Sequence, residues 1–148
     1  MKKLVSLFVL FIGAHIAAQS VDYNTKKGYM ANGYDVVSYF DGQPIHGEKE
    51  FATAYDGVRY KFASLGNLDK FKANPDKYVP KYGGYCAYAI AVSGKKVSIN
   101  PETYEIHDHQ LYLFYNSGKT NTLEAWTKES PEVLRAKADT NWEKIKQK

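Results

Sequence analysis

Two short runs of alternating residues give the clearest prediction of local structure in this chain. The positions that alternate onto one face are Phe51, Thr53 and Tyr55 in the first run, and Val58, Tyr60 and Phe62 in the second. Asp56-Gly57 stands between the runs, and Asp-Gly is favoured in two-residue type I′ turns because both central positions need positive φ. We therefore expect a β-hairpin over residues 50–62.

Helical patterns follow this hairpin and recur at the end of the chain. Ser64 is a suitable N-cap for a helix over residues 65–73. Pro75 stops that helix and begins a further turn, which Pro80 ends. From Gly118 onward the apolar positions again follow a helical period, which predicts C-terminal helices. The broad apolar face of the last helix is made by Val133, Leu134, Ala138, Trp142 and Ile145.

The residues between the two helical regions predict more strands. Residues 95–99 are expected to form a short strand, and residues 103–107 and 110–115 a second hairpin around Asp108-His109. No repeat or internal linker interrupts the chain. The expected fold class is α+β.

Two segments near the start have weaker patterns. Residues 34–40 fit either a short β-rich piece or a single helical turn. Residues 21–32 are polar and dotted with tyrosine, which indicates a leader that lies on the domain or is partly mobile. We expect a single domain over residues 33–148, with the C-terminal helices as an extension.

The stretch over residues 74–91 is the expected packing centre. It contains the single cysteine, Cys86, and the adjacent glycines Gly83 and Gly84, which let one element stop and the next start at close range. Two sets of residues follow a helical spacing: Tyr78, Tyr82 and Tyr85 in one, and Cys86, Ala89 and Ile90 in the other. This stretch is also the first place to look for chemistry.

The first twenty residues are typical of an export signal. Lys2 and Lys3 precede an apolar run that ends in small residues, and cleavage after Ser20 places Ala18 at −3. The apolar run is shorter than the ~20 residues that a spanning helix needs. We expect an exported protein, periplasmic or secreted, with no membrane span after cleavage.

Composition narrows the possible partners. The formal charge of +4 falls to +2 when Lys2 and Lys3 leave with the signal, and the remaining charges are interspersed, which argues against a nucleic-acid partner. One cysteine cannot form an internal disulfide, and it excludes metal sites that need two cysteines of one chain. The expected partner is a small ligand, a metal or another protein.

Cys86 is the first candidate for a functional residue, and it allows two interpretations. It is either a small buried apolar residue among tyrosines, or a thiolate near a helix start that acts as a ligand or redox group. His107 and His109 are spaced i, i+2 and would suit copper or zinc on one strand face, although a turn also explains His109. Met30 is a possible thioether ligand.

The tyrosines give a third candidate site. Tyr82, Tyr85 and Tyr88 could line a cleft for a small apolar or aromatic ligand, although tyrosine at this spacing more often covers a core edge. No acid pair, phosphate loop, HExxH or GxSxG motif is present, so the sequence gives little support for an enzyme.

The residues from Val58 to Tyr78 resemble the YHS domain, a short module of a hairpin and a helix that ends in a Phe-x-x-Asn-Pro-x-Lys-Tyr signature. The matching positions are Phe71, Asn74, Pro75, Lys77 and Tyr78. A longer resemblance, from Gly33 to about Tyr115, is to small exported proteins that carry this domain. These have a Gly-Tyr-Asp-Val-Val-Ser-Tyr-Phe-like start and a Tyr-Gly-Gly-Tyr-Cys-Ala segment.

The resemblance implies a metal-handling origin but not a metal site. Related modules on copper and heavy-metal transport ATPases have cysteines after the second strand of the hairpin and four residues later. Those positions are Ala63 and Asn67 here, and neither can bind a soft metal as a thiolate does. We therefore expect an exported, non-enzymatic binding or accessory module. The alternatives are a copper or other soft-metal binder that uses Cys86 with histidine or methionine, and a thiol-dependent redox protein.

Overall fold

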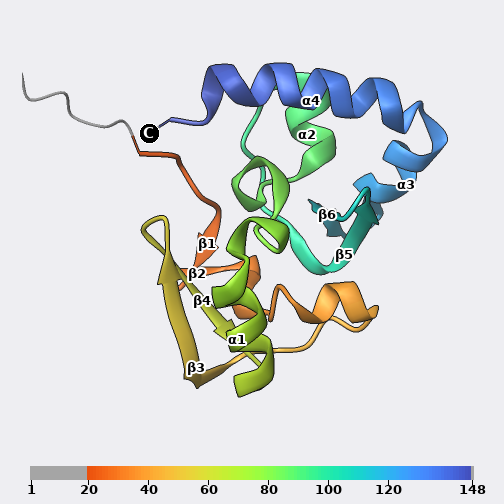
Figure 1. The fold of residues 1–148 in the computed structure, drawn as a ribbon. Helices are drawn as coiled ribbons and strands as arrows, with labels where there is room; N and C mark the ends of the chain where they lie inside the picture. The colour runs from red at the N-terminus through yellow and green to blue at the C-terminus, as the bar shows by residue number, and fades with distance from the viewer. Residues whose placement is uncertain (1–19, 148) are drawn as a thin grey trace, which may run out of the picture.

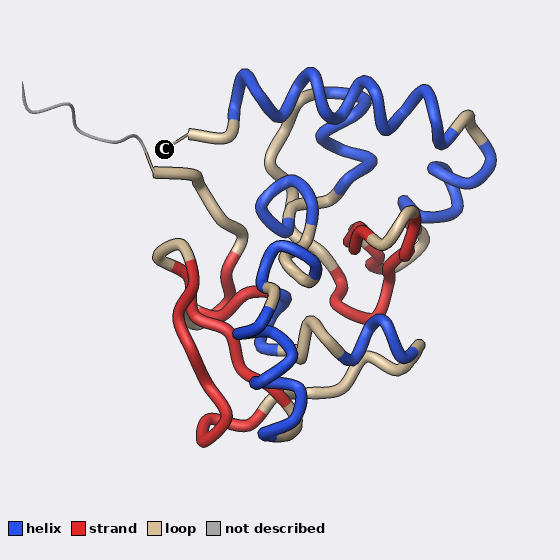
Figure 2. Tube along the Cα trace, in the orientation of Figure 1, coloured by secondary structure: helices blue, strands red, loops and turns tan. Residues whose placement is uncertain are grey.

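The computed structural model describes residues 20–147, so the predicted signal segment lies outside the described residues except for Ser20. The fold is α+β, as expected, with C-terminal helices (Figures 1 and 2). Its helices are α1 (Leu65–Ala73), α2 (Ala87–Ser93), α3 (Thr122–Lys128) and α4 (Pro131–Ile145). Its strands are β1 (Thr25–Lys26), β2 (Tyr29–Met30), β3 (Glu48–Tyr55), β4 (Val58–Phe62), β5 (Asn100–His107), β6 (Gln110–Phe114), β7 (Asn116–Ser117) and β8 (Thr120–Asn121).

The predicted first hairpin is confirmed as β3 and β4, which pair antiparallel around Asp56-Gly57. Both turn residues have positive φ, 48° and 74°, as a type I′ turn requires. The hairpin belongs to a four-stranded sheet of order β1-β2-β4-β3. The segment expected as a leader lies on the domain and supplies two of these strands, which the sequence did not predict.

Helix α1 begins where the sequence predicts. The Ser64 hydroxyl oxygen accepts a hydrogen bond from the Asn67 backbone N–H at 3.2 Å, which caps the first turn. Phe71 of α1 lies 4.7 Å from the ring of Tyr60 and 5.0 Å from that of Phe62, centroid to centroid. The helix therefore covers the inner face of β4, and the expected short turn follows it at Pro75–Lys77.

The second predicted hairpin is also confirmed, as β5 and β6 around Asp108-His109, with φ of 48° and 59°. The prediction of a strand over residues 95–99 is wrong. Within the described part of the chain that segment has no strand pairing, and Val97 O instead accepts a hydrogen bond from Cys86 N at 2.9 Å. The segment is used to hold the start of α2 rather than to extend a sheet.

Two hydrophobic clusters meet at the Tyr/Gly/Cys-rich stretch. One is built on the four-stranded sheet and α1, and the other lies between α2, α3, α4 and β6. Figure 1 shows α2, α3 and α4 on one side of the molecule and β1–β4 with α1 on the other. Residues 78–86 run between them, so this stretch is the packing centre that the sequence predicted.

The helical spacing of Tyr78, Tyr82 and Tyr85 does not produce a helix. Pro80 interrupts the segment, and Tyr82, Gly83 and Gly84 all have positive φ. The chain makes a left-handed turn there, and α2 starts only after Cys86.

Gly84 is the position in this turn that most clearly requires glycine. Its φ is +78°, and a Cβ atom at this site would lie 2.6 Å from Met30 Sδ. Its carbonyl oxygen also accepts a hydrogen bond from Asn24 Nδ2 at 2.9 Å. Through these contacts of Met30 and Asn24 with Gly84, the N-terminal segment packs against the packing centre.

We expect Gly84→Ala to lower the free energy of unfolding by about 2–4 kcal/mol, because a positive φ and a steric clash add together. Gly118→Ala is the matched control, since Gly118 has φ +58° and no described atom lies within 4 Å of the position that a Cβ would take. The control should lose only about 1 kcal/mol in urea-induced unfolding. Equal losses in the two variants would contradict the packing argument.

Candidate functional site

A buried carboxylate lies where the YHS-like module meets the segment before it. The Asp35 side chain is fully buried. Its Oδ1 accepts hydrogen bonds from the backbone N–H groups of Val37 at 2.9 Å and Ser38 at 3.4 Å. Its Oδ2 accepts from Ala63 N at 2.9 Å and from Asn67 Nδ2 at 2.7 Å. Four donors therefore satisfy one carboxylate, which offsets the cost of burying it.

The same network shows that these residues do not reproduce the metal site of related modules. The two positions where those modules have cysteines, Ala63 and Asn67, both contact the same oxygen of Asp35. A metal ion needs lone pairs directed at it, whereas Ala63 and Asn67 present N–H donors here. The donor set does not fit a metal ion, and the carboxylate holds these segments together instead.

We expect Asp35→Asn to lower the free energy of unfolding by about 3 kcal/mol, because an amide has one acceptor oxygen and its NH₂ would face an N–H donor. Asp41→Asn is the control, since Asp41 is exposed. Urea unfolding measures both variants. A loss below about 1 kcal/mol for Asp35→Asn would show that the network is not a main support of the fold.

Cys86 lies in the interior, beside a hydroxyl group. It is fully buried and precedes the first residue of α2. Its Sγ lies 3.3 Å from Thr122 Oγ1, and Thr122 Oγ1 donates to Tyr115 O at 2.8 Å. The hydroxyl hydrogen is used in that second bond, so the thiol S–H donates to Thr122 Oγ1. A buried thiol with a hydrogen-bond partner is compatible with the first interpretation of Cys86, and the choice between the two interpretations stays a prediction.

The two histidines lie at the turn between β5 and β6. His107 Nε2 is 3.1 Å from Asp108 Oδ2, and His109 is exposed. Within residues 20–147, no three histidine, cysteine, aspartate or glutamate side chains form a group that could hold a metal ion. The structure thus does not gather Cys86, His107 and His109 into one site. Met30 is buried with its sulfur against the Gly84 position.

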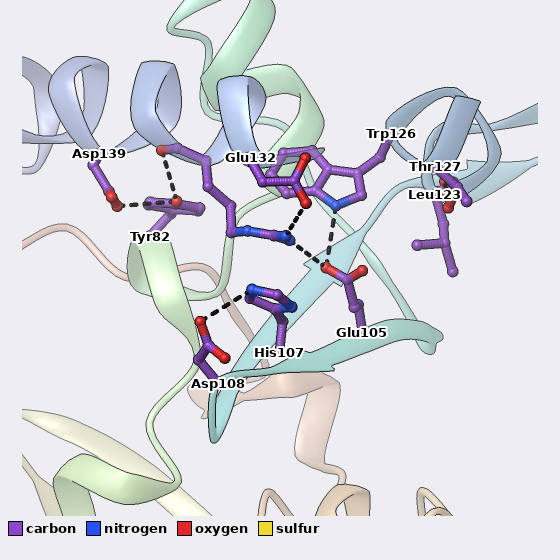
Figure 3. Close-up of polar contacts among 10 residues, drawn as sticks. Tyr82, Glu105, His107, Asp108, Leu123, Trp126, Thr127, Glu132 and Asp139 are labelled. Atoms are coloured by element: carbon purple, nitrogen blue, oxygen red, sulfur yellow. Dashed lines mark hydrogen bonds and ion pairs between the residues drawn. The ribbon is translucent and has the colours of Figure 1, made fainter. Parts of the chain in front are cut away.

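A polar network joins the second hairpin to the C-terminal helices. Glu105 on β5 accepts hydrogen bonds from Trp126 Nε1 at 3.1 Å and from Arg135 Nη1 at 3.0 Å. Figure 3 shows the Glu105 carboxylate beneath the Trp126 indole, with His107 further along the same strand. Trp126 is fully buried, so its indole N–H needs this acceptor. The network fixes α3 and α4 on the hairpin, which is a structural role.

The three tyrosines expected to line a cleft each have a structural partner. Tyr82 donates to Asp139 Oδ1 at 3.1 Å, Tyr85 to Asp22 Oδ2 at 3.0 Å, and Tyr88 to Glu129 Oε1 at 2.7 Å. Burial, with the hydrogen bond to Asp22 adding to it, raises the pKa of Tyr85 to about 12. Burial likewise raises the pKa of Tyr82 well above its ordinary value.

These tyrosine hydroxyls are donors to carboxylates on different elements. Tyr82 and Tyr85 lie against α4, where their rings are 6.4 Å and 6.3 Å from that of Trp142. The structure therefore uses these side chains at the edge of the second hydrophobic cluster.

The clearest cavity among the described residues lies elsewhere, on the outer face of the four-stranded sheet. It has a volume of about 780 Å³ and is open on one side. We call it the basic cleft; its lining residues are Lys26, Lys27, Tyr29, Asn32, Tyr34, His46, Lys49, Arg59, Lys61 and Pro101. Five of these are lysine or arginine, and none is a carboxylate.

The basic cleft is not predicted from the sequence because its cations come from separate elements. They lie on β1, on the following turn, on β3 and on β4, and the overall charge is mild. The available signal was the alternation on β4, where Arg59 and Lys61 are outward and Tyr60 is inward. It becomes meaningful only when the N-terminal strands are known to lie beside β4.

The hairpin, the helix packed on it and the following short turn define a small α+β module, closed at its start by the buried Asp35. Comparison with known protein families identifies this module: the chain contains a YHS domain at residues 36–82. No curated protein and no solved structure gave a match. The matched domain thus ends at Tyr82, and the second hairpin, α3 and α4 lie beyond it. No helix of the described residues is long and apolar enough to cross a membrane.

Proposed function

We propose that this YHS domain protein is an exported, non-enzymatic binding module that works without a bound metal. The observation that carries the proposal is the Asp35 network. The atoms that Ala63 and Asn67 present to Asp35 are hydrogen-bond donors. The YHS fold is present here, while Ala63 and Asn67 stand at the two positions where related modules have cysteines. We take this as support for a role of the domain as a scaffold for binding rather than as a metal site.

The basic cleft is the site that we assign to the ligand. It is concave, and it lies on a sheet whose strands are fixed by pairing, as is typical of preformed binding sites. Its lining, as far as the structure describes it, has no carboxylate and no cysteine or serine. Among the described lining residues, no lysine or tyrosine is hydrogen-bonded to the imidazole of His46, so we assign the cleft to binding rather than to catalysis.

Titration with Cu(I) under reducing conditions tests the metal-free part of the proposal. We expect residues 21–148 to show no stoichiometric binding tighter than roughly micromolar, and Cys86→Ala to behave identically. A chelator of known affinity in the same titration provides the reference. Stoichiometric binding that disappears in Cys86→Ala would favour the alternative, a soft-metal binder that uses this thiol.

A thiol-labelling experiment tests the redox alternative. Because Cys86 is fully buried and its S–H is engaged with Thr122, we expect a thiol reagent to modify the folded chain only as fast as the chain unfolds. The same reagent in denaturant gives the reference rate. Rapid labelling of the folded chain would support a reactive thiol and contradict a purely structural one.

A further inference from the structure

We infer that the basic cleft binds a multiply charged anion of the phosphoryl type, either a free phosphorylated compound or the headgroup of an anionic lipid. This inference rests on the proposed function, since it names the ligand of that binding module. Three observations support it: the arrangement of the cations, the absence of salt bridges to them among the described residues, and the conformation of the backbone around them.

The floor of the cleft is a tyrosine that holds two cations together. Tyr29 of β2 is only 8% exposed. The Arg59 guanidinium lies 4.3 Å from the centre of its ring, and the Lys61 ammonium 5.2 Å. Arg59 Nη2 also donates a hydrogen bond to the Tyr29 hydroxyl. Two like charges are thereby held at one aromatic ring, and a bound anion would relieve the repulsion between them.

The strand pairing extends this floor into a row. Lys26 of β1 pairs with Tyr29, and Tyr29 pairs with Arg59. On the other side of β4, the residues opposite Arg59 and Lys61 on β3 are Ala54 and Ala52. A carboxylate at either alanine would be in position to neutralise its cross-strand partner. The sheet has small, uncharged side chains there instead.

The five cations of the cleft also lack ion pairs elsewhere. Among the residues that the structure describes, none of Lys26, Lys27, Lys49, Arg59 and Lys61 forms a salt bridge. Other cations of the same chain do, for example Lys96 with Asp22 at 2.9 Å and Arg135 with Glu105 at 3.0 Å. Glu102 accepts a hydrogen bond from Tyr34 at 3.1 Å, but it does not line the cleft. Glu48 and Glu50 share a neighbouring hollow with Lys49 and Lys61, so the positive field of the cleft is least compensated at Lys26, Lys27 and Arg59.

The backbone at the edge of the cleft adopts conformations that local preference disfavours. Ala31, Asn32 and Gly33 are consecutive residues with φ of 49°, 55° and 85°, and Lys27 has φ of 53°. Alanine and lysine rarely occupy this region, and such strain is often found at binding sites. At Gly33 a Cβ atom would lie 2.6 Å from Lys61 Cε. The absence of a side chain lets the Lys61 stem lie across the backbone and reach the Tyr29 ring.

The chemistry of these groups selects a phosphoryl group over a single carboxylate. Several ammonium groups and one guanidinium surround a space of about 780 Å³, so one monovalent anion would leave most of the charge unpaired. A phosphate monoester or a pyrophosphate carries about two or more charges near neutral pH and several acceptor oxygens. The rings of Tyr34 and His46 lie 4.0 Å apart, centroid to centroid, and form a wall for the non-phosphate part of the ligand.

Calorimetric titration of residues 21–148 with inorganic pyrophosphate at low ionic strength tests the inference. We expect one site per chain, with affinity that decreases as salt is added. The double variant Arg59→Gln/Lys61→Gln should bind at least roughly tenfold more weakly, because two charge-assisted contacts are lost. The matched control is Lys72→Gln/Lys144→Gln, which removes the same charge from exposed positions on α1 and α4. Equal weakening in the control would overturn the inference, and so would the absence of binding both to pyrophosphate and to anionic vesicles.

A second variant separates loss of binding from loss of folding. Lys27 occupies a turn position where asparagine is favoured, so Lys27→Asn should raise the melting temperature. It should also weaken pyrophosphate binding, by roughly threefold, since one cation leaves the cleft. If Lys27→Asn is more stable but binds pyrophosphate with unchanged affinity, Lys27 does not take part in binding and the proposed site is too large.

Vesicle sedimentation distinguishes the two sources of the phosphoryl group. Binding to phosphatidic acid vesicles, whose monoester headgroup can carry two charges, would assign the site to a lipid headgroup if it is absent with phosphatidylcholine and lost in Arg59→Gln/Lys61→Gln. Pyrophosphate binding without vesicle binding would assign it to a free compound. If neither probe binds while Cu(I) also fails to bind, the anion inference is wrong and the metal-free proposal stands. Stoichiometric Cu(I) binding would overturn the proposed function itself.

Discussion

The buried Asp35 carboxylate is the constraint on which the rest of this structure depends. Its two oxygens accept four N–H groups from three parts of the chain: the turn that follows it, the end of β4 and the first turn of α1. A buried carboxylate is stable only when such donors replace water. The start of the YHS domain is thereby fixed to the hairpin and helix at its centre. That attachment holds the segment that connects β2 to β3, which includes Tyr34 and His46 of the cleft.

The same network explains how a YHS domain can persist without metal ligands. In related modules thiolates occupy the two positions that correspond to Ala63 and Asn67, whereas here an amide and a backbone N–H meet a carboxylate. Here the end of the hairpin is joined to the first turn of the helix through hydrogen bonds to Asp35. The hydrogen bonds to Asp35 thus hold the end of β4 to the first turn of α1, and the rest of the domain surface is available to other ligands.

Features that are determined by adjacent residues could be predicted from the sequence, whereas features that depend on long-range contacts could not. The hairpins followed from adjacent residues, Asp56-Gly57 and Asp108-His109, and the start of α1 from Ser64, because turns and caps are local. The expected strand at residues 95–99 was wrong because Val97 bonds to Cys86 rather than to another strand. Tyrosine spacing suggested a helix that the positive φ of Tyr82 prevents.

The candidate sites show the same dependence on long-range contacts. The contact between the Cys86 thiol and Thr122, 36 residues away along the chain, could not be predicted from the residues around Cys86. The basic cleft needed the pairing of β2 with β4, which joins Tyr29 to Arg59 through a strand of two residues. Such a short strand has too few positions for any periodicity to be visible. In the sequence, the cations of the cleft are therefore indistinguishable from dispersed surface charge.

The central claim is that a hydrogen-bonded carboxylate stands where this domain would otherwise bind a metal. A crystal structure of residues 21–148, grown with excess copper under reducing conditions and measured at the copper absorption edge, tests it most directly. The account predicts no anomalous peak near Asp35, with Ala63 N and Asn67 Nδ2 still within hydrogen-bond distance of Oδ2. An anomalous peak within about 2.3 Å of either Asp35 oxygen, with Asn67 displaced, would contradict it.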